Sequence, residues 1–155
     1  MNRTALVSLV GLALFLTACP IGPFAGGRLS GDVHSGGVAD WAFVEDVETC
    51  QLETNPDDPH SVNTWCLGWE GDLYVPTSMI LGPTDPSERD WVVNVQSDPA
   101  VRVRVEGVVY ELEAERVMDD EVYGAVLAAL EEKYDADPAD REAEREIWLF
   151  RLRER

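Results

Sequence analysis

Basic residues are scarce in this chain of 155 residues: 12 lysines and arginines stand against 30 aspartates and glutamates, and the formal net charge is −18. Lys133 is the only lysine. A surface this acidic repels nucleic acids and anionic lipid headgroups, so we exclude a nucleic-acid-binding function. The spaced Asp, Asn and Gly residues of a calcium-binding loop are missing too. We therefore interpret the acidic residues as a solvated coat.

The sequence also lacks the short motifs that identify many enzymes and cofactor-binding proteins. It contains no P-loop, dinucleotide fingerprint, nucleophile elbow, metal-binding helix motif or haem-attachment motif. The two histidines, His34 and His60, lie in a glycine-rich segment and in a turn, and we assign them to the surface. We assign the five tryptophans to packing, with the lining of a pocket as the alternative. The sequence thus predicts no catalytic residue and no metal site.

The N-terminal apolar run is too short to cross a membrane. It extends from Ala5 to Leu16, contains Ser8 as its one polar residue, and follows Arg3. A membrane-spanning helix needs about 20 apolar residues, so this run is typical of a signal peptide. Residues 1–18 are therefore predicted to be removed from the mature protein.

The end of this run carries a specific motif. The four residues "LTAC", ending at Cys19, resemble the lipobox of bacterial lipoproteins. In that family the cysteine is lipidated, with palmitate among its acyl chains, and two or more chains give a stable membrane anchor. Pro20 stands where an aspartate would retain the protein in the inner membrane, so we expect the outer membrane, facing the periplasm. An ordinary secretory signal followed by a chance cysteine is the alternative.

The other two cysteines are predicted to form a disulfide. Exported proteins with two cysteines usually pair them, and the midpoint between Cys50 and Cys66 is Asp58, inside the turn sequence "NPDDPH". A hairpin folded there would place the two cysteines opposite each other. A metal site is the alternative, but His60 is the only further ligand nearby.

Composition divides the mature chain into two parts. Residues 20–39 hold six glycines and two prolines, so we interpret residues 19–39 as a lipidated N-terminus and a tether, with a short strand within 28–33. Residues 40–155 are predicted to form one domain.

Alternating or helical hydrophobic patterns predict the elements of this domain. Strands are expected over residues 44–52, 61–69 and 73–77, and a hairpin over 101–114 turns at Glu106–Gly107. A helix capped by Asp85 or Ser87 ends before Pro99, a second helix runs from Asp119 or Asp120 to Tyr134, and a last strand covers residues 147–152. Because Arg102 and Arg104 alternate with the apolar residues of the hairpin, we expect both in solvent.

Three stretches of the sequence resemble a known family. "LYVPTS", "DWVVNVQSDPAVRVRVEGVVYELEAERVMDDEV" and "EKY" are similar to the deazaflavin-dependent nitroreductase branch of the pyridoxamine-phosphate-oxidase-like superfamily, which has the FMN-binding split β-barrel fold. Trp91, Asn94 and Pro99 match its helix and N-x-x-x-x-P motif. The resemblance implies a mainly β (α+β) domain: one split β-barrel of about six to seven mostly antiparallel strands with two or three helices. It also implies a fold that holds a flavin or deazaflavin, often in a homodimer.

The resemblance also points to candidate site residues. The family's phosphate-binding positions correspond to Thr77, Ser78, Arg89 and Trp91, and hydroxyl and guanidinium groups at the start of a helix suit an anion. The segment "MILGPTDPSERD" departs from the family pattern, because it carries three acidic residues where the family is basic and glycine-rich. We therefore expect no bound cofactor, with FMN or a deazaflavin as the alternative.

These observations favour a lipid-anchored envelope protein whose split-barrel domain is a non-catalytic binding or structural module. A flavin- or deazaflavin-dependent reductase of the envelope is the alternative, and a barrel that binds another small ligand, such as haem, is the second alternative.

Overall fold

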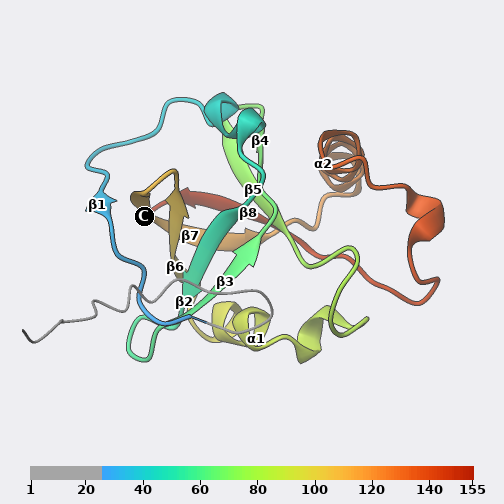
Figure 1. Ribbon diagram of the computed structural model, residues 1–155, viewed down its shortest axis with the longest axis horizontal. Coiled ribbons are helices and arrows are strands. Elements are labelled where there is room, and N and C mark those ends of the chain that lie inside the picture. The colour runs from blue at the N-terminus through green and yellow to red at the C-terminus, as the bar shows by residue number, and fades with distance from the viewer. Residues whose placement is uncertain (1–25) are drawn as a thin grey trace, which may run out of the picture.

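Eight strands and two α-helices make up residues 26–155, the part of the chain that the computed structural model describes (Figure 1). The predicted lipidation site, Cys19, lies outside this part. The strands are β1 (Asp32–Val33), β2 (Cys50–Thr54), β3 (His60–Thr64), β4 (Leu67–Trp69), β5 (Asp72–Pro76), β6 (Ala100–Val105), β7 (Val108–Arg116) and β8 (Leu149–Glu154). The helices are α1 (Asp90–Ser97) and α2 (Asp120–Lys133), with short 3-10 turns η1 (Ala42–Asp46), η2 (Pro86–Glu88) and η3 (Pro138–Asp140).

The strands form one sheet in the order β3-β2-β6-β7-β8-β5-β4, and every neighbouring pair in this order is antiparallel. Strand β7 is shared along one edge: β8 pairs with Leu112–Arg116, and the short β1 pairs in parallel with Val108 and Val109. The outermost strands, β3 and β4, do not pair with each other, although only Trp65 and Cys66 separate them in sequence. The predicted mainly β, split-barrel fold is confirmed, and the barrel is open.

The hairpin of β6 and β7 follows directly from its sequence. Val101, Val103 and Val105 are buried, and they alternate with residues on the opposite face of β6. Glu106 and Gly107 form the turn, and both have positive φ, 48° and 87°. Such left-handed pairs match the twist of a two-residue hairpin, and the glycine adopts this conformation without strain.

Both predicted helices are present; α2 starts at a side-chain cap, whereas the predicted cap by Asp85 lies at the turn η2 before α1, and α1 itself starts without one. The Asp85 carboxylate accepts a hydrogen bond from the Ser87 N–H at the start of η2, which leads into α1. Helix α2 begins after Asp119, whose carboxylate accepts from two backbone N–H groups of the first turn. Such caps stabilise a helix by about 1 kcal/mol. Figure 1 shows α1 below the sheet and α2 at one end of it.

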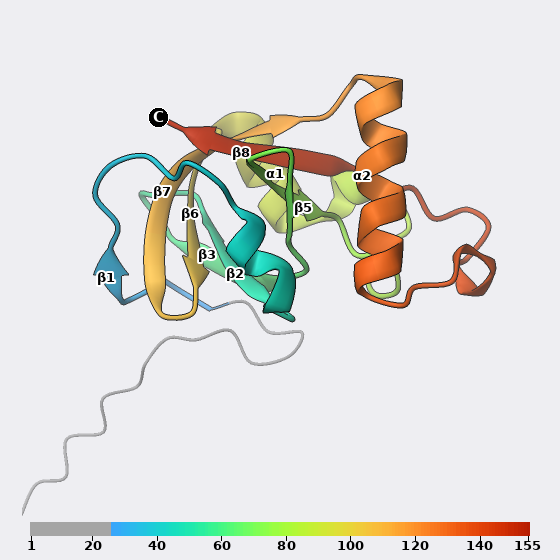
Figure 2. The same cartoon turned by 90° about the horizontal axis from the view of Figure 1, so that it is seen from above.

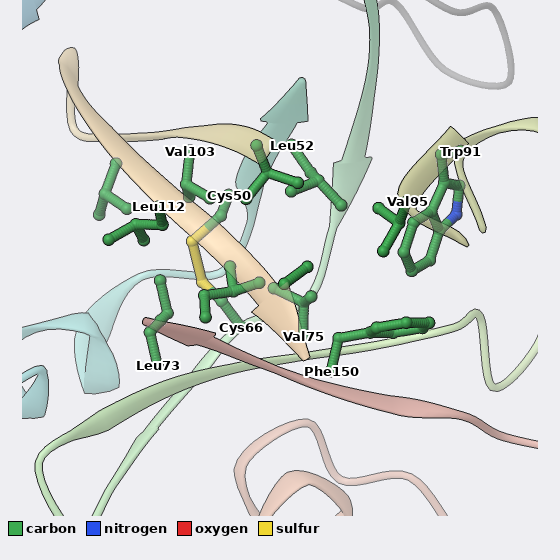
Figure 3. Packing of buried hydrophobic residues seen from close by; sticks show 14 of the residues in the cluster. Cys50, Leu52, Cys66, Leu73, Val75, Trp91, Val95, Val103, Leu112 and Phe150 are labelled. Atoms are coloured by element: carbon green, nitrogen blue, oxygen red, sulfur yellow. A yellow bond between two sulfur atoms is a disulfide. The ribbon is translucent and has the colours of Figure 1, made fainter. Parts of the chain in front are cut away.

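The main core lies inside the curved sheet and is closed by α1. Figure 3 shows the disulfide between Cys50 and Cys66 within this cluster, next to valine and leucine side chains of the surrounding strands. A second cluster packs α2 against β4, β5 and the start of β8. In the β2–β3 ladder Cys50 lies opposite Thr64, because the turn is centred one residue earlier than predicted. Cys66 reaches Cys50 from the bend that follows β3.

Two of the predicted strands differ from the structure. Residues 44–48 are not a strand: η1 occupies 42–46, because the Asp40 carboxylate accepts from the Ala42 N–H and starts a tight turn. Residues 61–69 are two strands, because the chain bends at Trp65 and Cys66 to pass from one end of the sheet to the other.

Residues 26–38, which we call the strap, lie against the sheet instead of hanging free as a tether (Figure 2). Gly26 pairs with Ser61 at the edge of β3, and the Leu29 side chain is only 2% exposed. The backbone of Leu29 is held by two charged side chains: its N–H donates to Glu53, and its carbonyl accepts from Arg102.

The strap also corrects our expectation that Arg102 and Arg104 face solvent. Arg102 donates to the carboxylate of Glu53 at 3.1 Å, and this carboxylate is 2% exposed. Arg104 donates to the Gln51 side chain at 2.6 Å and to the Ser30 carbonyl at 2.8 Å. Both arginines alternate with buried valines as predicted, but the strap covers their face of the sheet.

No helix within residues 26–155 is long and apolar enough to cross a membrane.

Candidate functional site

A cleft of about 360 Å³ opens where β7 ends, α2 begins and the chain enters β8. Figure 1 shows the elements that contribute to it: the end of β7, helix α2 and the segment that leads from α2 to β8. Its walls include three arginines, Arg116, Arg141 and Arg145, together with the rings of Tyr123 and Trp148. This gathering of arginines is notable in a chain with only 12 basic residues.

The guanidinium of Arg116 is the available cation of the cleft. It lies 3.5 Å above the centre of the Trp148 ring, and it makes no hydrogen bond or ion pair with any residue in 26–155. Stacking on an indole orients a guanidinium while leaving its N–H groups free. The indole N–H of Trp148 donates to the carboxylate of Glu146 at 3.3 Å, which fixes the ring.

Arg145 has a different role, because its side chain is 3% exposed and fully engaged. It donates to the backbone carbonyls of Leu81, Gly82 and Pro83 and forms an ion pair with Glu142 at 2.6 Å. It therefore fixes the 81–83 loop from inside the protein.

Arg89, a residue that the sequence assigned to phosphate binding, supports the same loop. Its guanidinium donates to the Leu81 carbonyl at 2.5 Å and to the Pro83 carbonyl at 2.9 Å. Burial, and next the charge of Arg145, lower the pKa of Arg89. Its Nε is buried without a hydrogen-bond partner among the described residues. Two guanidinium groups thus converge on one loop.

The third arginine is also engaged. Arg141 forms an ion pair with Glu131 of α2, which holds the segment after α2 against the helix. The hydroxyl of Tyr123 donates to the Ile147 carbonyl at 2.9 Å and connects α2 to the chain just before β8. Burial raises the pKa of Tyr123, so its hydroxyl keeps its proton at neutral pH.

The structure places the other sequence-predicted site residues behind the cleft or away from it. Thr77 is fully buried: its N–H donates to the Trp148 carbonyl and its hydroxyl accepts from the Trp148 N–H. Ser78 accepts from the N–H groups of the next loop residues, with a distance of 2.8 Å to that of Leu81. Trp91 is 7% exposed and packs edge-on against Phe150 in the core.

Thr77, Ser78 and Arg89 are therefore brought to one loop, but their polar groups serve that loop and the Trp148 backbone. Sequence reasoning missed the residues that line the cleft, Arg116 and Trp148. They come from segments more than 30 residues apart, and only the scarcity of basic residues relative to acidic ones could have drawn attention to Arg116.

The cleft can bind an aromatic ligand that carries an anionic group. The Arg116 guanidinium, which covers one face of the Trp148 indole, offers a flat cationic surface with free N–H donors, and the Tyr123 ring also lines the cleft. Asp120 and Glu146 also line the cleft, so its charge is mixed, not uniformly positive. No group of three or more His, Cys, Asp or Glu residues in 26–155 is placed to hold a metal ion.

Comparison with known proteins gives one family and a set of similar folds. The family described as F420H(2)-dependent quinone reductase matches residues 66–152, more than half of the chain. None of the curated proteins compared matches this chain.

Solved structures with the same fold have different described functions. An F420-H2 dependent reductase, FDR-A, is 20% identical over 68% of this chain and 94% of its own, with a TM-score of 0.53. The haem storage protein HutZ from Vibrio cholerae is 18% identical over 73% of this chain and 85% of its own, with a TM-score of 0.54. A structure described as a domain-swapped dimer is 20% identical over 69% and 81%, with a TM-score of 0.52. At these identities the likeness shows the fold alone.

Proposed function

Because the chain belongs to the F420H(2)-dependent quinone reductase family, we propose that it is a deazaflavin-dependent reductase that holds its cofactor in the cleft beside α2. This function replaces the non-catalytic module that the sequence alone favoured, since the family match supports the alternative. The observation that carries the proposal is the free Arg116 guanidinium stacked on Trp148. This guanidinium is a cation held in a fixed orientation by an aromatic ring, and it can attract an anionic ligand in a protein whose net negative charge otherwise repels anions.

The residues of the cleft fit a deazaflavin in distinct roles. The Arg116 guanidinium would bind an anionic group of the cofactor through charged hydrogen bonds, and Trp148 would support that guanidinium from behind. When bound, a reduced deazaflavin supplies a hydride to an acceptor. Thr77 fixes the Trp148 backbone and so positions one wall of the cleft, and Arg145, which also lines the cleft, is held by the carbonyls of the 81–83 loop that Arg89 fixes as well.

A haem-binding function has no support from the residues of the cleft. Neither histidine lines it: His34 lies in the strap and His60 begins β3, both away from the end of β7. We therefore carry only the reductase forward.

Binding of F420 to the purified full chain tests this proposal, with FMN as the comparison ligand. We expect F420 to bind, and Arg116→Ala to weaken binding at least tenfold, since a charged hydrogen bond contributes about 1.5–3 kcal/mol. Arg153→Ala is the matched control: it removes an arginine that pairs with Glu115 outside the cleft, and it should leave affinity unchanged. Absence of F420 binding, or equal losses in both variants, would return the chain to the non-catalytic module.

The location proposed for this reductase is the cell envelope, where Cys19 would carry the lipid anchor and hold the domain on the periplasmic face of the outer membrane. The motif that ends at Cys19, behind a short apolar run, supports the proposal. We also keep the homodimer as a prediction, which sedimentation of the purified protein can test.

A further inference from the structure

A second cavity, of about 350 Å³, lies between the strap and the sheet and shares no residue with the cleft. One wall is the strap from His34 to Val38. The other consists of Tyr110 and Glu111 of β7, together with Glu154 and Arg155 at the end of the chain. Figure 2 shows the strap passing from β1 to η1 in front of this part of the sheet.

The strap is held at both ends of the cavity and carries no bulky side chain between them. The His34 N–H donates to the Val109 carbonyl at 2.8 Å, and the Val38 N–H donates to the Glu154 carboxylate at 2.7 Å. Gly36 and Gly37 lie between these points. A Cβ atom on Gly37 would lie 2.5 Å from the Glu154 carboxylate, so a larger residue there would require the Glu154 side chain to move. The strap therefore crosses the cavity between two hydrogen bonds, with only small residues in between.

Two aromatic side chains, His34 and Tyr110, line the cavity, and Trp41 and Phe43 pack against Tyr110 outside the lining. The Tyr110 ring contacts the rings of His34, Trp41 and Phe43, with centroid distances of 5.0, 4.8 and 6.4 Å. Among residues 26–155, neither the Tyr110 hydroxyl nor the His34 side chain has a hydrogen-bond partner, although Tyr110 is half-buried. These two polar groups are therefore free to meet solvent or a ligand in the cavity.

The charged groups of the cavity that remain available to a ligand are mainly negative. The carboxylates of Glu111 and Glu154 line it. The one cation in its wall, Arg155, is engaged with the Leu112 and Val101 carbonyls at 3.1 and 3.0 Å. Arg102, next to Glu111 at 3.7 Å, is also paired with the buried Glu53. In a chain of net charge −18, such a cavity attracts cations and repels anions.

We propose that this cavity binds a small organic cation of the quaternary ammonium class. The ammonium group lies against the Tyr110 ring, and the carboxylates of Glu111 and Glu154 balance its charge. Aromatic faces attract such ions through the ring quadrupole, and an alkylated ammonium is desolvated more easily than a metal ion. The cavity is independent of the cleft, so this site stands whether or not the chain is a reductase.

Titration of the full chain with choline, and with its uncharged isostere 3,3-dimethylbutan-1-ol, tests the proposal by calorimetry. We expect choline to bind roughly tenfold or more tightly than the isostere, because the two differ only in charge. Equal binding of both compounds would show an apolar pocket without cation selectivity and would overturn the proposal, as would no choline binding at all.

Variants assign the binding to this cavity. Tyr110→Leu should weaken choline binding about tenfold. Glu154→Gln keeps an acceptor for the Val38 N–H but removes the charge, so it should weaken choline binding several-fold without releasing the strap. Glu144→Gln, a charge removed from an exposed site remote from the cavity, and Arg116→Ala in the cleft should change nothing. Losses of equal size in Glu154→Gln and Glu144→Gln would show that only net charge matters and would refute the site.

Discussion

Replacing Glu53 by alanine should cost about 3–5 kcal/mol of the free energy of unfolding, because it breaks a buried ion pair and leaves the partner charge uncompensated. The Glu53 carboxylate receives hydrogen bonds from Arg102 and from the Leu29 N–H, and it is 2% exposed. Arg28 adds little, because its side chain is 58% exposed and 3.7 Å away. A loss of this size is a large part of the 5–15 kcal/mol typical of a whole domain.

Urea unfolding of the oxidised protein, followed by tryptophan fluorescence, measures this cost. Glu53→Gln should lose roughly half as much, since the amide oxygen still accepts one hydrogen bond but the charge is gone. Glu113→Ala, which removes an exposed carboxylate from β7, is the matched control and should stay within about 0.5 kcal/mol of the parent.

A double-mutant cycle with Arg102→Met decides whether the two charges act together. The double variant should lose much less than the sum of the single losses, because no unpaired charge is left once both partners are removed. Additive losses, or a loss in Glu53→Ala no larger than that of Glu113→Ala, would refute the buried pair as the clamp that holds the strap.

Three further predictions concern the cysteines and the cleft. Protein folded in an oxidising compartment should show no free thiol at Cys50 or Cys66 until it is reduced, which mass spectrometry after alkylation with and without reductant checks. Reduction should lower the free energy of unfolding by about 3 kcal/mol, because the disulfide closes a loop of this length in the unfolded chain. Cys19→Ala should leave an uncut precursor that takes up no labelled palmitate, whereas labelling equal to that of the parent would exclude the anchor. Thr77→Val should weaken F420 binding with little change in fold, because the Trp148 N–H loses its acceptor; unchanged affinity beside an unchanged circular dichroism spectrum would contradict that positioning role.

The sequence predicted those elements whose residues carry a complete local pattern. The hairpin of β6 and β7 alternates without interruption and has a turn pair suited to positive φ, and α2 begins at an aspartate that caps it. Residues 44–48 alternate only weakly, so the cap by Asp40 and the packing of Trp41 against the sheet decided their conformation instead. The local sequence pattern is enough to predict an element where one face of it is clearly apolar. It fails where the local preferences for strand and turn are both weak, because tertiary contacts then decide the conformation.

The candidate site was predicted less well, because its geometry depends on contacts between distant segments. Glu53 lies in a strand between Leu52 and Thr54 and has no local sign of burial, yet Leu29, 24 residues earlier, covers it. Arg89, predicted to bind a phosphate, lies next to the loop after β5, and nothing in its neighbourhood predicts Arg145, which donates to the same Pro83 carbonyl from a segment 56 residues later. Pairings of this kind come from the fold and have no signature in either segment.

The disulfide between Cys50 and Cys66 also affects the register in which the strands of the open sheet pair. Cys66 lies in the bend between β3 and β4, so its position depends on the β2–β3 ladder on one side and the β4–β5 ladder on the other. A slip of one residue in a ladder turns every side chain of that strand to the opposite face. Either slip would carry the Cys66 thiol away from Cys50, and the bond could not form. The disulfide therefore forms only in those molecules in which both ends of the sheet have reached the correct register, and it then fixes that register covalently.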